Sequence, residues 1–240
     1  MRLSAVRKFF EPWVARSNRP FPAFLLSKCS LLNVLVSNWR SRWDDKVADY
    51  SKAPVAIRPH REESDVLEEG TSFYVRICLE FGYRHLFDVG SLDGERALHV
   101  KHLLPNVEVT GLDISPSYRE PQVVNGVTFR RFGLDVFRER RVKAVAAANI
   151  AFTYFSPATL LELFTILREH GYAVALREPQ PIFYNDEDLR RSRNSYYHNY
   201  ERALRRAGYG RITTNHRAMP MPINLGATER WLLLHAATED

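Results

Sequence analysis

One segment constrains the fold more than any other part of the chain: an apolar run that ends in Asp88 and is followed by Gly90 and Gly94. A second apolar run ends in Asp113, nineteen residues after Gly94. Two apolar runs that each end in an acid, separated by glycines and a helix, predict a βαβ unit that binds a nucleoside. Glycines let the backbone approach a ligand closely, and the second acid can accept hydrogen bonds from both hydroxyls of a ribose.

The spacing of the glycines separates two classes of cofactor. A dinucleotide fingerprint has glycines at offsets of zero, two and five, whereas Gly90 and Gly94 stand at offsets of zero and four, with Asp88 two residues before the first. This D-x-G-x-x-x-G form resembles the first motif of class I S-adenosylmethionine-dependent methyltransferases, although the family's usual middle glycine is Leu92 here. The resemblance implies S-adenosyl-L-methionine as the cofactor rather than a nicotinamide.

The order of the predicted elements extends the resemblance to residues 64–237. Apolar periodicity predicts helices over 64–81, after Gly94, over 158–170 and over 196–207, and strands over 86–89, 107–112, 127–132, 142–148, 172–176, 211–216 and 230–236. No helix separates the last two strands, so these must pair antiparallel. The fold class implied is α/β: a Rossmann-like, seven-stranded, mostly parallel sheet with a terminal antiparallel strand, plus an N-terminal helical arm.

Composition indicates one globular domain with an appendage. The 240 residues are 45% apolar and 26% charged, and the net charge is +6. Residues 1–43 hold eight Lys and Arg against one Glu, while the other residues carry 26 basic and 27 acidic groups. We divide the chain into a basic, aromatic-rich helical arm and linker (1–60) and a methyltransferase domain (61–240). Because the domain is nearly neutral, we expect no nucleic-acid partner.

The basic arm (residues 1–43) combines its cations with aromatic side chains, namely Phe9, Phe10, Trp13, Phe21, Phe24, Trp39 and Trp43. Three interpretations stay open. A helix of this kind suits an anionic membrane or partner surface, where each Lys or Arg contributes about 1 kcal/mol. It also suits an extra helix packed over the cofactor cleft, or a transit peptide. We expect a cytoplasmic protein with peripheral membrane contact through this arm, and organellar targeting stays open.

The resemblance also assigns residues to the cofactor. Each of the following matches a position of the family's motifs: Asp88, Gly90 and Gly94 beside the methionine portion, Asp113 on the ribose, Ile114 beside the adenine, and Asp135 on the adenine amino group. For Asp135, a helix cap is the alternative. No metal site is expected.

The acceptor should lie outside the carboxyl ends of the later strands. There the sequence places Asn149, Tyr154, Arg177, Asn199 and Tyr200, which we expect to bind the acceptor. A hydroxyl acceptor gains from a general base with a pKa near neutrality, and His198 is the candidate. The segment His198-Asn199-Tyr200 is similar to one in sugar O-methyltransferases of bacterial polysaccharide biosynthesis.

These resemblances imply an enzyme, an S-adenosylmethionine-dependent methyltransferase that acts on a hydroxyl of a sugar or polysaccharide-linked acceptor. Two alternatives stay open. An N-methyltransferase acting on a small-molecule or protein amine would use Asn149-Ile150-Ala151-Phe152, which has the outer residues of the N-P-P-Y/F motif but neither proline. A non-catalytic, methyltransferase-like binding or regulatory subunit would explain Leu92 and the lack of an acid at the start of strand 142–148.

Overall fold

The structure is a computed structural model that describes residues 56–57, 69–139, 141–181, 189–190, 196–218 and 229–238. The basic arm, the predicted boundary at residue 60 and the predicted helical residues 64–68 lie outside the described residues. Each of these therefore stays a prediction. Within the described part of the chain, no helix is long and apolar enough to cross a membrane.

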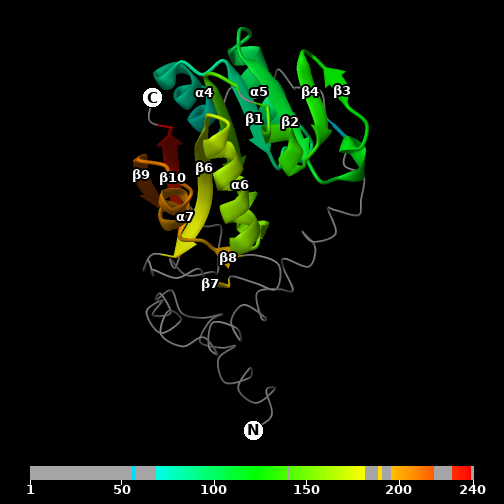
Figure 1. The fold of residues 1–240 in the computed structure, drawn as a ribbon. Coiled ribbons are helices and arrows are strands. Elements are labelled where there is room, and N and C mark those ends of the chain that lie inside the picture. The colour runs from blue at the N-terminus through cyan, green and yellow to red at the C-terminus, as the bar shows by residue number, and fades with distance from the viewer. Residues whose placement is uncertain are drawn as a thin grey trace, which may run out of the picture.

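An eight-stranded sheet forms the middle of the molecule (Figure 1). Its order is β3-β4-β2-β1-β5-β6-β10-β9. The bounds are β1 His85–Val89, β2 Glu108–Asp113, β3 Gln122–Val124, β4 Val127–Arg131, β5 Ala144–Asn149, β6 Tyr172–Pro181, β9 Arg211–Ala218 and β10 Glu229–Ala237. A separate two-stranded sheet pairs β7 (Leu189–Arg190) with β8 (Tyr196–Tyr197). The strands β4, β2, β1, β5 and β6 are parallel, and β10 lies antiparallel between β6 and β9. The predicted Rossmann-like sheet with a reversed terminal strand is confirmed.

The eighth strand, β3, was not predicted. It pairs antiparallel with β4 across a turn at Asn125 and Gly126. Both turn residues have positive φ, 48° and 77°. Two consecutive left-handed residues are typical of a type I′ hairpin turn, for which Asn-Gly is the preferred sequence. The hairpin therefore adds one short edge strand to the seven that were predicted.

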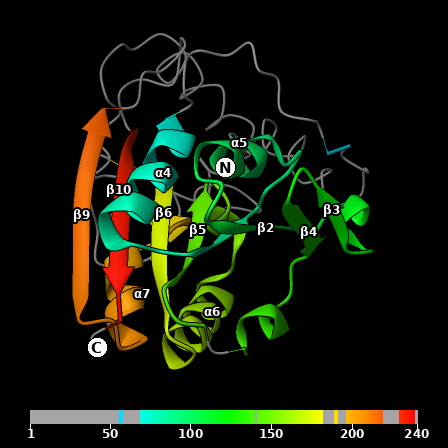
Figure 2. The same ribbon diagram turned by 90° about the horizontal axis from the view of Figure 1, so that it is seen from above.

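Helices cover both faces of the sheet (Figure 2). The helices α4 (Glu69–Phe81) and α5 (Glu95–Leu103) pack on one face, and α6 (Pro157–Glu169) and α7 (Tyr200–Arg206) pack on the other. In β5, Ala144, Ala146 and Ala148 join the core under α6, whereas Val145 and Ala147 join the core under α4. This alternation follows from the two-residue period of a strand, and a parallel strand buried on both faces is apolar throughout.

The starts of two helices show how the sequence sets their bounds. Ser156 caps α6, where its hydroxyl accepts a hydrogen bond from the Thr159 N–H at 3.1 Å. Asn199 caps α7 in the same way, with its Oδ1 2.8 Å from the Arg202 nitrogen. The predicted helix over 196–207 is therefore wrong at its start, because Tyr196 belongs to β8 and the helix begins only after the Asn199 cap.

Candidate functional site

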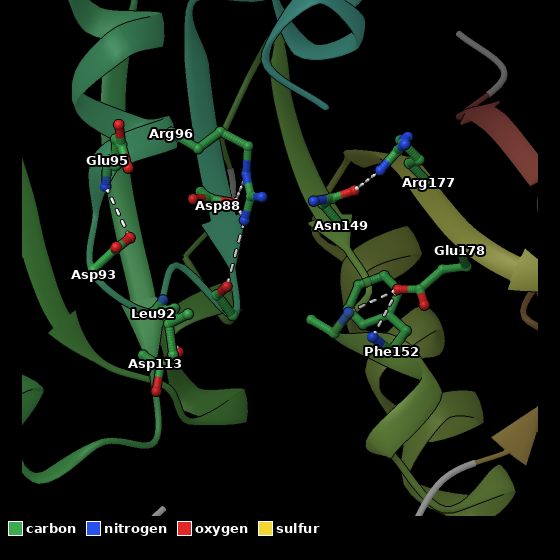
Figure 3. Close-up of polar contacts among 12 residues, drawn as sticks. Asp88, Leu92, Asp93, Glu95, Arg96, Asp113, Asn149, Phe152, Arg177 and Glu178 are labelled. Carbon is green, nitrogen blue, oxygen red and sulfur yellow. Dashed lines mark hydrogen bonds and ion pairs between the residues drawn. The ribbon is translucent and has the colours of Figure 1, made fainter. Parts of the chain in front are cut away.

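The carboxyl ends of the parallel strands bring four of the predicted site residues to one edge of the sheet (Figure 3). Asp88 lies near the end of β1, two residues before Gly90, and Asp113 ends β2. Asn149 ends β5 and stands in register with Arg177 of β6. The figure separates these residues into a group around the glycine loop and a second group around Asn149.

Asp88 is a fully buried carboxylate. Its Oδ1 lies 3.3 Å from both Nε and Nη2 of Arg96, which lies in the first turn of α5 and neutralises the buried charge. Among the described residues, Oδ2 has no hydrogen-bond partner. The neighbouring Tyr74 is also fully buried, and burial raises the pKa of its hydroxyl well above the ordinary value, so that it stays protonated. A buried oxygen that lacks a partner marks this carboxylate as able to accept a further donor.

Asp113 organises the glycine loop. Its Oδ2 accepts a hydrogen bond from the Leu92 N–H at 3.0 Å, and its Oδ1 accepts one from the Ser115 N–H at 2.8 Å. Leu92 has a φ of 53°, in the left-handed region that favours glycine. The Tyr118 hydroxyl donates to the Leu92 carbonyl at 2.9 Å. Leucine therefore takes the backbone path that glycine would take, held by one hydrogen bond on its N–H and another on its carbonyl.

The glycines are required by packing within the protein. A Cβ on Gly90 would lie 2.5 Å from the Cβ of Ala151, and Gly90 also has a φ of 76°. A Cβ on Gly94 or on Gly111 of β2 would lie within 2.7 Å of the Phe129 ring. Gly111 was not predicted as a site residue, although its place two residues before Asp113 was available as a signal. These close approaches leave the backbone, rather than side chains, lining this part of the edge.

Two further residues were assigned to an adenine. Ile114 directly follows β2 and exposes 53% of its surface. Asp135 is exposed in the first turn of a short 3-10 helix (Leu134–Phe137) after β4. Gly133 occupies the cap position of that helix, so the alternative role of Asp135 as a helix cap is wrong. The adenine contacts of both residues stay predictions.

In the second group, Arg177 connects β6 to the start of α4. Its Nη1 donates to Asn149 Oδ1 at 2.9 Å, and its Nη2 pairs with Glu69 at 2.6 Å. The guanidinium carbon stacks 3.6 Å from the centre of the Trp231 ring. A planar guanidinium suits such a combination of stacking and directed donors. Arg177 is buried and its charge is compensated, so its side chain fixes the orientation of the Asn149 amide.

The loop after β5 (residues 150–152) is held by β6. Ile150 has a φ of 61°, which costs a β-branched residue about 1–3 kcal/mol. Its N–H donates to the Arg177 carbonyl at 3.0 Å. The next two N–H groups, of Ala151 and Phe152, donate to Oε1 of Glu178 at 3.0 and 2.8 Å. Glu178 is fully buried, and its role was not predicted. The adjacent charged residues Arg177 and Glu178 lie in an otherwise mostly apolar strand, and this was the feature of the sequence that could have indicated a structural role for Glu178.

His198 lies between β8 and α7 and exposes only 2% of its surface. Its Nε2 is 3.0 Å from the Phe155 carbonyl, which can only accept, so Nε2 carries a proton in this contact. The ring packs between Tyr196 and Tyr200, with centroid distances of 5.4 and 5.3 Å. The His198 carbonyl accepts from Gln180 at 2.7 Å, which places this segment beside the end of β6.

Three other residues were predicted to bind the acceptor, namely Tyr154, Asn199 and Tyr200. Asn199 uses its Oδ1 to cap α7, and Tyr200, the first residue of α7, is fully buried in the core shared with α6. Tyr154 is half-buried in a 3-10 helix (Phe152–Tyr154) next to the loop after β5. The structure thus brings Asn149 and Arg177 together, and it gives Asn199 and Tyr200 roles in the fold itself. An acceptor contact of these residues stays a prediction.

Comparison with known proteins gives similarity in structure and none in sequence. No family profile matches the sequence, and no curated protein gives a significant match. The N-terminal domain of EvdMO1, crystallised with SAH and D-fucose, is 12% identical, with a TM-score of 0.52 over 83% of this chain and 97% of that domain. The same domain with SAH alone gives a TM-score of 0.51 at the same coverage. Human N-acetylserotonin methyltransferase in complex with SAM is 12% identical, with a TM-score of 0.46 over 72% of this chain and 52% of that one.

The strand order of this chain is the same evidence for the fold, independent of any comparison. Five parallel strands are followed by a hairpin whose last strand, β10, inserts antiparallel beside β6. The glycine loop stands after β1, and an acid ends β2, as the motif spacing predicts. The described part of the chain has the fold of class I S-adenosylmethionine-dependent methyltransferases.

Proposed function

We propose that this protein is an S-adenosylmethionine-dependent methyltransferase whose acceptor group is a hydroxyl. The observation that carries the proposal is the placement of Asp88, the Gly90–Gly94 loop and Asp113 at one carboxyl edge of a sheet with a reversed terminal strand. The EvdMO1 domain with this fold was crystallised with SAH, the demethylated form of the cofactor.

The residues present fit this cofactor. Asp88 Oδ2 and Ser91 Oγ are buried polar atoms beside the glycine loop, and each makes no hydrogen bond of ordinary length to a described residue, with the Tyr74 and Tyr118 hydroxyls as their respective neighbours. Asp113 uses one acceptor site on each carboxylate oxygen, which leaves lone pairs for two ribose hydroxyls. Asp88 and Gly90 would hold the methionine portion, and Ile114 and the adenine would be neighbours. When bound, S-adenosylmethionine supplies an electrophilic methyl group on a sulfonium.

The orientation of Asn149 favours a hydroxyl over an amine. Arg177 can only donate, so the Asn149 amide turns its oxygen toward Arg177 and its NH₂ group away. An NH₂ group donates to the oxygen of an acceptor hydroxyl, whereas holding a target amine requires the amide oxygen as acceptor. The N-methyltransferase alternative needs the opposite orientation, and this contact argues against it.

His198 is the proposed general base. Its Nε2 proton is held by the Phe155 carbonyl, so Nδ1 is the atom that would take the proton of the acceptor hydroxyl as the oxygen attacks. A fixed tautomer and a ring packed between two tyrosines restrict the direction from which that proton can come. Asn149 and Arg177, with Tyr154, would orient the acceptor.

For the acceptor itself we propose a sugar or a polysaccharide-linked glycan, on the cytoplasmic side and with peripheral membrane contact through residues 1–43. Two observations support it: the similarity of residues 198–200 to sugar O-methyltransferases, and the D-fucose present in the EvdMO1 crystal. A basic arm rich in aromatic residues suits surfaces where lipid-linked glycans are built.

The test is methyl transfer from isotopically labelled S-adenosylmethionine to a panel of free sugars, nucleotide sugars and amines. We expect label on a sugar oxygen, and a loss of about 10²- to 10⁴-fold in turnover for His198→Ala. Cofactor affinity should be nearly unchanged in that variant. Label on an amine, with turnover abolished by Asn149→Ala, would establish the N-methyltransferase instead. Cofactor binding without any product across the panel would favour a non-catalytic subunit.

A further inference from the structure

Three consecutive backbone N–H groups after β5 point at one strand. The Ile150 N–H continues the ladder between β5 and β6 by donating to the Arg177 carbonyl. The N–H groups of Ala151 and Phe152 leave the ladder and converge on a single oxygen, Oε1 of Glu178 (Figure 3). Convergence of this kind requires a particular backbone conformation.

That conformation is a backbone nest. Ile150 is left-handed at φ 61°, and Ala151 is right-handed at φ −103° and ψ −42°. A left-handed residue followed by a right-handed one turns successive N–H groups into one concavity, which favours an anion. Here the anion comes from the protein itself, because the carboxylate of the fully buried Glu178 lies in the concavity.

The nest also explains the residue types of the loop. In the N-P-P-Y/F motif two prolines occupy the positions of Ile150 and Ala151 and shape the loop. Proline lacks an N–H group, so a loop built on prolines offers the anion less to bind. Isoleucine and alanine keep their N–H groups, and that of Ile150 donates to the Arg177 carbonyl while that of Ala151 donates to Glu178. In this chain the Glu178 carboxylate therefore holds the loop conformation that the rigid proline rings hold in the motif.

The loop connects the two halves of the candidate site. Asn149 precedes the nest directly, and its amide faces Arg177. Ala151, inside the nest, packs closely against Gly90. A Cβ on Gly90 would lie 2.5 Å from the Cβ of Ala151. Movement of the nest would therefore displace the side-chain amide of Asn149. The same movement would also break the contact between Ala151 and Gly90.

We propose that Glu178 is a positioning residue: its carboxylate is the built-in anion of the nest at residues 150–152, and it fixes Asn149 and Ala151 for transfer of the methyl group. The proposal rests on the proposed function, because it names what sets the geometry of that site. Glu178 itself need not touch the acceptor or the cofactor.

Hydrogen–deuterium exchange of the full-length protein tests this without any acceptor. In Glu178→Ala we expect exchange at Ala151 and Phe152 to become about tenfold faster or more, because both N–H groups lose a charged acceptor. Added formate should restore most of the protection, because a small carboxylate can enter the vacated concavity. Glu201→Ala, which removes a partly exposed glutamate on α7, is the matched control and should leave this loop unchanged.

A general loss of stability would speed exchange in the whole sheet and would not respond to formate, so that result would overturn the proposal. If the alanine variant does not fold, Glu178→Gln carries the test, since its amide keeps the size and loses the charge. We expect faster exchange at the same two residues, again in the loop alone. Unchanged exchange in whichever variant folds would overturn the proposal. Methyl transfer plays no part in this readout, so failure of the proposed function would be seen separately, as wild-type protein with a protected loop and no product.

Discussion

The backbone N–H of Leu92 donates a hydrogen bond to Oδ2 of Asp113, with the two atoms 3.0 Å apart. The acid that the motif assigns to a ribose therefore also holds the glycine loop. Ser115 N–H binds the other carboxylate oxygen, so one side chain fixes the loop after β1 to the end of β2. Loss of this carboxylate should affect both the folded state and the binding of the cofactor.

We expect Asp113→Ala to lower the affinity for SAH at least tenfold, because two ribose hydrogen bonds to a charged acceptor are worth roughly 1–3 kcal/mol each. It should also destabilise the ligand-free protein, since the N–H groups of Leu92 and Ser115 lose their acceptor. Calorimetric titration and urea unfolding measure the two effects. Asp113→Asn keeps an acceptor oxygen and should lose less of both; equal losses in the two variants would contradict this account.

The left-handed backbone at Leu92 gives a second prediction. Glycine at this position removes a strain of about 1–2 kcal/mol, whereas alanine keeps it. Both substitutions remove the same partly exposed side chain. Leu92→Gly should therefore be more stable than Leu92→Ala by about 1 kcal/mol, after the entropy that glycine adds to the unfolded chain. Urea unfolding of the two variants checks this, and an alanine variant as stable as the glycine variant would show that φ is not strained there.

Gly90 and Gly82 form a matched pair for the contact with Ala151. Both have positive φ, 76° and 67°, but a Cβ on Gly82 would meet nothing within 4 Å. Gly82→Ala should thus cost only the left-handed strain, about 1–2 kcal/mol. Gly90→Ala should cost about 1–3 kcal/mol more, because its Cβ overlaps that of Ala151. Adding Ala151→Gly to Gly90→Ala should restore the stability that the overlap removes, measured by thermal unfolding. A double variant no more stable than Gly90→Ala would show that the overlap with Ala151 is not the cause of the loss.

A buried histidine predicts how stability varies with pH. Burial lowers the pKa of His235 to about 4, while Tyr83 binds its Nε2 at 2.7 Å and Phe81 stacks on its ring. The unfolded chain takes up the proton near pH 6.5, so protonation favours unfolding. The stabilising contribution is complete above about pH 6.5 and is lost as the pH falls toward 4, by up to about 3 kcal/mol.

Free energies of unfolding measured from pH 7 to pH 4 test this slope. His235→Gln stays neutral over that range and keeps a partner for Tyr83, so the slope should become shallower. His102→Gln removes an exposed histidine and should leave the slope as it is. If the free energy of unfolding of His235→Gln falls with pH as steeply as that of the wild type, groups other than His235 cause the pH dependence.

The parallel strands were predictable because burial on both faces makes them short, continuous apolar runs. Residues 144–149 illustrate this, since every one of them except the terminal Asn149 is fully buried. Strand β3 was missed although Asn125-Gly126 is a strong hairpin signal, because its three residues are too few and too exposed to show a pattern. The start of α7 was misplaced because Tyr196 and Tyr197 fit an apolar periodicity, while the cap that decides the boundary is Asn199.

For the candidate site, the sequence placed Asp88 and Asp113 correctly at strand ends, because motif spacing fixes which residues reach the edge. It did not reveal the contact of Glu178 with the loop after β5. That contact depends on the register of β5 with β6, where Asn149 stands opposite Arg177, and on a left-handed isoleucine that no propensity favours. The double role of Asp113 was missed for the same reason, because it depends on how the glycine loop folds back over β2.

Calorimetric titration of the full-length protein with SAH and with NADH tests the central claim most directly. The glycine spacing, the acid at the end of β2 and the reversed β10 lead us to expect saturable binding of SAH at one site and no heat from NADH. The SAH signal should weaken at least tenfold in affinity in Asp113→Ala. Binding of NADH without binding of SAH would contradict the account.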